Sequence, residues 1–270
     1  MKRTDFDALG DRMKMYEGME AARRLMPGLP VMARLDGRSF HTFTRGMPRP
    51  YHAPMSQAMI ETARYLVTET HSAFAYTQSD EITLGFWNED PKSQMLFDGR
   101  IQKLTSVLAS LASVKFNQEV LARMPDKAHL LPVFDARVWS LPTLDEMANA
   151  VLWRSLDCTK NAITMAASAY YSHKELHGKS SADKHQLLHE KGVNFVNYPA
   201  FFKDGTLLRR ELVERELSPA ELSRIPEKHR PSGPVTRSVV SEVDLPPFAW
   251  LSNKVGVLFN GEPPVRLTLS

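Results

Sequence analysis

The chain of 270 residues is 43% hydrophobic and carries 34 Lys and Arg against 31 Asp and Glu, a formal net charge of +3. This length and apolar content suffice for a sizeable core in one domain or in two closely packed halves, and they exclude a disordered protein. The small basic excess permits an RNA partner without requiring one.

The cysteine content and the hydropathy pattern bear on the compartment. Cys158 is the single cysteine, which excludes an internal disulfide and is typical of a reducing environment. The N-terminus leads into no apolar secretory segment, and no later run approaches the length of a membrane span. We therefore expect a soluble, cytoplasmic protein with no membrane partner.

Hydrophobic periodicity and turn residues predict a regular order of elements in the first half. In chain order these are a helix over 6–25, a strand over 30–35, a helix beginning near Pro54, strands over 73–77 and 82–87, a helix over 99–116 and a strand over 131–138. After the first helix the order is β-α-β-β-α-β. This is the ferredoxin-like arrangement, in which two helices cover one face of an antiparallel sheet. We therefore predict an α+β fold with a catalytic domain over 1–140.

The second half, 141–270, predicts helical and strand additions packed on that domain. A capping-box pattern at 143–146 places a helix start there. A long helix over 153–171 then carries three polar residues at spacings that share a face, namely Lys160, Asn161 and Thr164. That face either lines a channel for triphosphate or RNA, or is simply solvated.

Two carboxylates stand where predicted strands end in turns, and they are the most informative feature of the chain. Asp36 follows the strand over 30–35, and Asp80 lies in the connection of the hairpin. In the ferredoxin-like topology the first strand is a neighbour of this hairpin, so the two turns can meet. Facing carboxylates beside a basic, glycine-containing turn can hold divalent ions against a triphosphate. The alternative is that both are ordinary turn-forming aspartates.

Two other motifs in the second half predict no site. Four histidines form two i, i+4 pairs, but the glutamate between the first two is one position away from the H-E-x-x-H pattern, so we reject a zinc site; the four are His173, His177, His185 and His189. The Gly-Lys-Ser sequence at 178–180 lacks the first glycine of a Walker motif, and we interpret it as a basic surface loop.

Four segments carry a family resemblance, and they lie in the same order as in the family over nearly the whole chain. With weaker matches at 182–184 and 235–237, they resemble the tRNA-histidine guanylyltransferase family and its Thg1-like proteins. The segments are RLDGRSFH at 34–41, YTQSDE at 76–81, FDARV at 134–138 and WRSLDCTKN at 153–161. The resemblance implies a polymerase-like palm that adds nucleotides to the 5′ end of tRNA, in the 3′-to-5′ direction. It also implies a homotetramer.

The resemblance further implies roles for particular residues. Two Mg²⁺ ions would be bound by Asp36, the main-chain carbonyl of Gly37 and Asp80, an oxygen-only set that a small hard cation prefers. Glu81 adjoins this site and either tunes it as a catalytic residue or faces solvent. The ATP, GTP or other nucleoside triphosphate would be held by Gly37, Arg38, Ser39, Phe40, His41, Ser79, the basic Arg49 and Asn161.

One departure from the family pattern bears on the substrate. The guanylyltransferases that act on tRNA-histidine carry His-Ile-Asn-x-x-x-Asn after the Asp-Cys pair, whereas this chain has TKNAITM at 159–165 and keeps only Asn161. The chain therefore looks more like a Thg1-like protein, which repairs truncated tRNA 5′ ends against the opposite strand after activation by ATP. The alternatives are guanylyl addition to tRNA-histidine, a palm-type nucleotide cyclase, and a binding module without catalysis.

Overall fold

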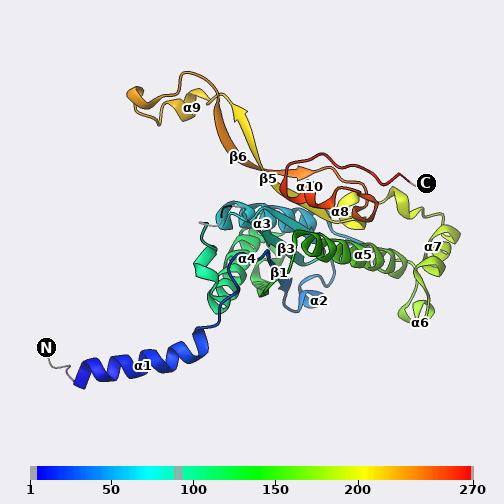
Figure 1. The fold of residues 1–270 in the computed structure, drawn as a ribbon. Coiled ribbons are helices and arrows are strands. Elements are labelled where there is room, and N and C mark those ends of the chain that lie inside the picture. Colours follow the sequence, from blue (N-terminus) through cyan, green and yellow to red (C-terminus); the bar gives the residue numbers. More distant parts are fainter. Residues whose placement is uncertain (1–4, 88–89, 91–92, 269–270) are drawn as a thin grey trace.

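The computed structural model describes residues 5–87, 90 and 93–268 of the chain (Figure 1). A six-stranded antiparallel sheet, in the order β4-β1-β3-β2-β5-β6, forms its centre. The strands are β1 Val31–Gly37, β2 Phe74–Gln78, β3 Glu81–Phe86, β4 Phe134–Ser140, β5 Thr206–Arg215 and β6 Val235–Val243. The first four in the order β4-β1-β3-β2 have the ferredoxin-like topology, so the predicted fold class is confirmed.

Helices of very different lengths surround the sheet. The α-helices are α1 Asp5–Ala21, α2 Phe40–Phe43, α3 Ala53–Thr70, α4 Ile101–Arg123, α5 Leu144–Ser168, α6 His173–Leu176, α7 Ser181–Glu190, α8 Ala200–Lys203, α9 Pro219–Leu222 and α10 Lys254–Phe259. Short 3-10 segments are η1 Leu96–Gly99, η2 Pro125–Leu130, η3 Phe195–Asn197, η4 Glu227–His229 and η5 Phe248–Trp250. Among the residues that the structure describes, no helix is long and apolar enough to cross a bilayer.

The helices α3 and α4 cover one face of the sheet, as the ferredoxin-like order predicts. Proline in the first turn suits the start of α3, because its missing N–H is not needed there. Both helices turn a buried stripe toward the alternating apolar residues of the strands. The residues that meet are Met59, Ala63 and Leu66 of α3, Leu108, Ala112 and Phe116 of α4, and Leu35, Ile82 and Leu84 of the sheet.

The second half of the chain covers part of the opposite face and extends the sheet. α5 packs on β1 and β2, and η5 and α10 complete this second core; the buried residues include Met32, Phe74, Tyr76, Met147, Val151, Phe248 and Val257. The strand β5 pairs with β2. The sheet therefore runs across the boundary expected near 140. Figure 1 shows the β5–β6 hairpin extending away from this body with α9 near its tip, and α1 lying apart on the other side.

Several boundaries differ from the predicted ones, and tertiary contacts explain two of them. α1 ends at Ala21 because Leu25 is buried beside Val31 and Leu104, and its N–H bonds the carbonyl of Gly99 at 2.9 Å. α4 continues seven residues past the expected end at 116, since Val120 prolongs its buried stripe. The hairpin strands are each shifted by one residue.

The long helix of the second half is one element where two were expected. α5 begins at Leu144, because the Thr143 hydroxyl accepts a hydrogen bond from the Glu146 N–H at 3.1 Å. The Glu146 carboxylate accepts from the Asn149 side chain at 2.9 Å, so the structure records only the first bond of the expected capping box. The helix then runs without a break to Ser168, three residues before the expected end.

Candidate active site

The turn after β1 and the turn between β2 and β3 meet at one end of the sheet. β1 and β3 pair with Asp36 opposite Glu81, and the Gly37 N–H donates to the Asp80 carbonyl at 3.0 Å. Sheet pairing thus holds the two turns side by side, although the chain runs through α2 and α3 between them. Asp36 and Asp80 are the charged residues that this contact brings together.

The environment of Asp80 shows that the two carboxylates interact. Burial and the charge of Asp36 raise the pKa of the Asp80 carboxyl, and the Ser79 hydroxyl, which donates to it at 3.1 Å, offsets part of this. Two hard, anionic oxygen donors in a partly buried turn form a set that fits a small divalent cation. The described residues contain no cluster of three or more His, Cys, Asp or Glu able to hold a metal. Main-chain carbonyl, phosphate and water oxygens would therefore have to complete the coordination.

Packing alone requires glycine at position 37, apart from any close approach to a ligand. A Cβ atom at this position would overlap the ring of Phe40. That ring is 4% exposed and lies 5.2–5.4 Å, between ring centroids, from three others, Phe43, Phe116 and Phe134. This aromatic cluster fixes the turn after β1 against α4.

The other residues of this turn differ in their surroundings. Arg38 and Ser39 are exposed, and Ser39 has a left-handed backbone with φ 57°. The Arg38 N–H donates to the Val133 carbonyl at 2.9 Å, which ties the turn to the residue before β4. His41 is exposed on α2.

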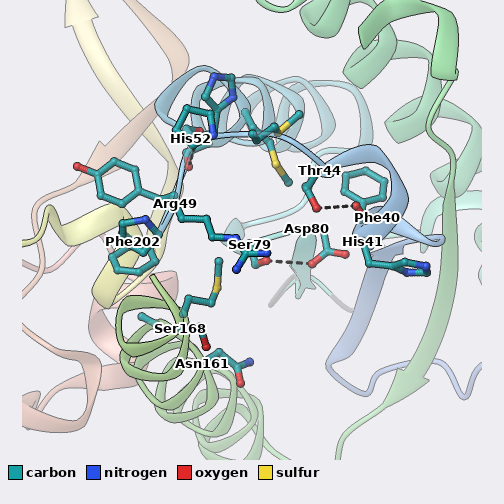
Figure 2. Close-up of a pocket in the computed structure, with 18 of the residues that line it drawn as sticks. Phe40, His41, Thr44, Arg49, His52, Ser79, Asp80, Asn161, Ser168 and Phe202 are labelled. Carbon is teal, nitrogen blue, oxygen red and sulfur yellow. Dashed lines mark hydrogen bonds between the residues drawn. The ribbon is translucent and has the colours of Figure 1, made fainter. Parts of the chain in front are cut away.

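A cleft of about 880 Å³ lies between these turns and α5. This volume is ample for a nucleotide. It is lined by Gly37, Ser39, Phe40 and His41 of the first turn, by Ser79 and Asp80 of the second, by the loop at 44–52, and by Cys158, Asn161 and Met165 of α5. Figure 2 shows the exposed Arg49 extending across the cleft toward Ser79 and Asp80. Most of the residues predicted to hold the triphosphate therefore share one cavity.

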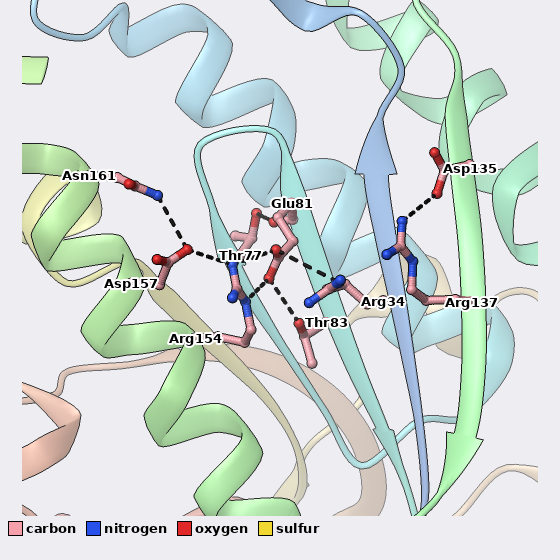
Figure 3. A network of polar contacts seen from close by, with 9 residues as sticks. All are labelled: Arg34, Thr77, Glu81, Thr83, Asp135, Arg137, Arg154, Asp157 and Asn161. Atoms are coloured by element: carbon pink, nitrogen blue, oxygen red, sulfur yellow. Dashed lines mark hydrogen bonds and ion pairs between the residues drawn. The ribbon is translucent and has the colours of Figure 1, made fainter.

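Glu81 does not face solvent, which was one of the two expectations for it. Its side chain is buried on the opposite side of β3 from α3, and Arg154 of α5 grips both of its oxygens, with Nε–Oε1 2.7 Å and Nη2–Oε2 2.8 Å (Figure 3). Arg34 of β1 lies 4.0 Å from the same carboxylate. Arg154 also donates to Asp157 at 2.9 Å. This bidentate ion pair ties α5 to the strand that follows Asp80.

Arg154 is a residue whose role sequence reasoning missed. It lies in the segment at 153–161, next to the Asp-Cys pair, but its partner Glu81 is 73 residues away. The only local signal was the i, i+3 spacing to Asp157, which is typical of an ion pair on a helix surface. The buried ion pair with Glu81 depends on how α5 packs on the sheet, which the sequence does not show.

Only part of the polar face expected on α5 lines the cleft. Asn161 and Thr164 line the cavity, and the Thr164 hydroxyl accepts a hydrogen bond from Lys184 Nζ at 3.0 Å. The Asn161 amide donates to Asp157 at 3.3 Å. Lys160 is exposed and is not among the lining residues. Thus two of the three residues expected to share a face contribute to the site.

Cys158 is buried at the inner wall of the cleft. Its sulfur lies 3.6 Å from the Lys203 carbonyl, beside the Tyr76 hydroxyl that donates to the Asp204 carbonyl at 2.6 Å. Burial raises the pKa of this thiol to about 12. The thiol therefore stays protonated near neutral pH and is a poor nucleophile.

The two histidine pairs lie in different parts of the second half. α6 spans His173–Leu176, so His177 follows its end. On α7, His185 packs edge-on against Phe195 with 5.1 Å between ring centroids, while His189 is exposed in the last turn. The rings of His173 and His177 lie 6.1 Å apart, and His185 and His189 are one turn apart on α7. Among the described residues, neither pair belongs to a cluster of three or more metal-binding side chains.

Comparisons with known proteins show which family the chain resembles. The family model described as tRNAHis guanylyltransferase (Thg1) matches residues 10–142. The tRNA(His) guanylyltransferase of Neurospora crassa is 30% identical over 222 residues, covering 75% of this chain and 74% of that protein. The uncharacterized protein R259 of Acanthamoeba polyphaga mimivirus is 30% identical over 234 residues, covering 78% of this chain and 80% of its own.

Solved structures give the same result. A bacterial Thg1-like protein in complex with ATP is 38% identical, with a TM-score of 0.70, and the match covers 75% of this chain and 87% of that one. A bacterial Thg1-like protein in complex with GTP is 32% identical, with a TM-score of 0.71 and coverage of 90% and 94%. The chain, with its palm-like sheet and paired carboxylates, therefore belongs to the tRNA(His) guanylyltransferase (Thg1) family.

Proposed function

We propose that this protein is a nucleotidyltransferase that adds nucleotides to the 5′ end of tRNA in the 3′-to-5′ direction, mainly to repair truncated ends against the opposite strand. The observation that carries the proposal is that Asp36 meets Asp80, and that Asp80 and Arg49 line one nucleotide-sized cleft. The ATP and GTP complexes of the similar bacterial proteins support nucleoside triphosphates as its ligands.

In this proposal, some residues of the site bind metal ions and others bind the triphosphate. Asp36, the Gly37 carbonyl and Asp80 would hold two Mg²⁺ ions, which when bound supply neutralisation of the phosphate charge. Arg49 places a fixed cation where the triphosphate would lie, and the hydroxyls of Ser39 and Ser79 offer donors to its oxygens. Such reactions need positioning and electrostatic stabilisation, and no covalent enzyme intermediate.

The proposed reaction has two steps in the same cleft. The 5′-monophosphate of the RNA first attacks ATP, which releases pyrophosphate and leaves an adenylylated 5′ end. The 3′-hydroxyl of the incoming nucleoside triphosphate then attacks the 5′ phosphate, and AMP leaves with the bonding electrons. The added nucleotide keeps its triphosphate, from which pyrophosphate is removed later. We further propose that the active form is a homotetramer in the cytoplasm.

Arg49 gives the first prediction. We expect Arg49→Ala to raise the KM for the nucleoside triphosphate, or to lower kcat if the contact forms mainly in the transition state, by about tenfold in either case, since a charge-assisted contact is lost. The affinity for tRNA should barely change. Steady-state kinetics at varied triphosphate concentration test this, with Arg123→Ala on α4 as a control cation outside the cleft. Weaker tRNA binding with unchanged triphosphate kinetics would instead place Arg49 in the RNA channel.

Base choice gives the second prediction and tests the function itself. The family histidine is replaced by Thr159, whose hydroxyl bonds the Ser155 carbonyl of its own helix at 3.2 Å, so the position offers no imidazole for choosing guanine. We expect the preferred triphosphate to follow the opposing base. The substrates are four tRNAs that lack the first nucleotide and differ in that base, each incubated with ATP, Mg²⁺ and one labelled triphosphate.

A second candidate, guanylyl addition to tRNA(His), is favoured by the names of the relatives. It predicts addition of G to every variant, or a requirement for the histidine anticodon. Either result would replace the repair function by this one. Addition that follows Watson–Crick pairing for all four bases, with the same enzyme and conditions, would establish repair.

A further inference from the structure

A strip of the sheet beside Asp36 is left open by α5. β1 and β4 pair with Asp36 opposite Asp135 and with Arg34 opposite Arg137. Because alternate residues of a strand point to the same face, these four side chains share one face of the sheet. Asp135 and Arg137 are exposed, with side chains 57% and 52% accessible, and Figure 3 shows them at the side of Arg34 away from α5.

Trp153 of α5 borders this strip. Its side chain is 56% exposed, and that of Leu156, three residues further along α5, is 53% exposed. The guanidinium carbon of Arg34 lies 5.7 Å from the centre of its ring, and that of Arg154 lies 4.5 Å from it. Both are cation–π distances. The exposed indole is therefore held in place by groups that belong to the neighbouring ion-pair network.

This support is rigid. Both Nε and Nη2 of Arg154 are bound by Glu81, and Asp157 accepts a further bond from the same side chain. Arg154 is buried, so its guanidinium cannot swing away without breaking a buried ion pair. An indole held by these neighbours and still 56% exposed can accept a flat ligand.

The open ring lies close to the carboxylate pair. Arg34 and Asp36 are two residues apart on β1, which corresponds to about 7 Å along a strand, and the Trp153 ring is in contact with Arg34. The base of a nucleotide is only one sugar away from its own 5′ phosphate. A phosphate held at Asp36 and Asp80 through metal ions would thus leave the attached base within reach of Trp153.

We propose that Trp153 is a stacking platform for the base of the 5′-terminal nucleotide of the RNA, with Arg34 and Arg137 facing its phosphate backbone. This inference rests on the proposed function. Aromatic rings bind bases of any identity through their faces, which suits an enzyme that accepts different 5′ ends. Both oxygens of Glu81 are bound by Arg154, and Arg34 lies 4.0 Å from this carboxylate, at the limit of an ion pair. Arg137 donates to the exposed Asp135 at 3.3 Å. Both arginines therefore have only long, weak ion pairs that a phosphate can replace.

The test compares two tryptophans with similar surroundings. Trp250 is 54% exposed and has Arg266 over its ring at 5.8 Å, but it belongs to η5 and does not line the strip. We expect Trp153→Ala to raise the Kd and KM for tRNA by about tenfold, the factor typical of one lost base–aromatic stack, without changing the KM for the triphosphate. Trp153→Phe should restore most of the affinity, and Trp250→Ala should match the wild type.

An RNA that lacks its 5′-terminal base makes the assignment specific. The wild type should lose about tenfold in affinity for this abasic RNA, whereas Trp153→Ala should lose nothing more. Equal losses in both proteins would overturn the platform. So would a change of oligomeric state in Trp153→Ala by sedimentation, which would assign the ring to an interface between copies.

These binding measurements need no turnover, so the platform and the proposed function fail separately. A wild type that adds no nucleotide but shows the coupling between Trp153 and the terminal base keeps the platform and refutes the reaction. A wild type that extends tRNA but shows no coupling keeps the reaction and refutes the platform.

Discussion

Replacing either Asp36 or Asp80 by alanine is expected to lower the rate of nucleotide addition at least about a hundredfold, because each change removes a metal ligand and with it several kcal/mol of charge stabilisation in the transition state. The fold should persist, since both residues lie in or beside a turn and neither belongs to the cores. Extension of a 5′-triphosphorylated RNA measures the second step alone, and circular dichroism monitors the fold.

Asp80→Asn tests whether the Asp80 carboxylate is needed for activity but not for stability. Because the pKa of Asp80 is raised in the folded state, ionising this carboxyl opposes folding, and the cost is present at pH values above the folded pKa. The neutral amide relieves burial of charge and repulsion by Asp36. We therefore expect a Tm at or above that of the wild type at pH 7 without Mg²⁺, and a difference that shrinks as the pH falls through the pKa.

The control for these variants is Asp126→Ala, an exposed aspartate of η2 away from the cleft, which should retain both activity and fold. Activity of the Asp36 or Asp80 variant within tenfold of the wild type would defeat the assignment of that residue to the metal site. A clearly lower Tm for Asp80→Asn would show that its carboxylate stabilises the turn.

The buried Glu81–Arg154 pair should have the largest effect on stability. We expect Glu81→Ala or Arg154→Ala to lower the free energy of unfolding by about 3–5 kcal/mol, because each removes the bidentate partner of a buried charge. Arg154 would keep only Asp157, and Glu81 would keep only Arg34 at 4.0 Å. Denaturation by urea, with the slope m compared between proteins, measures this. Glu242→Ala, which breaks the more exposed pair with Arg64, should cost less than about 1 kcal/mol.

A double variant decides whether the effect comes from the pair. Glu81→Leu combined with Arg154→Met removes both charges and keeps apolar volume, so it should recover much of the stability that either single change loses. Additive losses in the double variant would show that the two residues act independently. The double variant should also weaken tRNA binding, since Arg154 supports the ring of Trp153.

The sequence by itself determined the ferredoxin-like core and the place of the two carboxylates. Alternation in the strands and the stripes of α3 and α4 are local patterns, and the chain order of these elements leaves little freedom for their arrangement. Once β1 lies beside the hairpin, Asp36 and Asp80 must lie at the same end of the sheet. The Thr143 cap was likewise readable, because its bond spans only three residues.

Only the tertiary structure decided what surrounds these carboxylates. The partner of Glu81 lies 73 residues away on α5, and the position of β5 beside β2 depends on pairing across the whole second half. Gly37 is needed because the ring of Phe40 folds back over it, a contact that depends on the cluster with Phe116 and Phe134. Periodicity shows which face of an element is buried but not what it meets, since the packing of distant elements sets the partners.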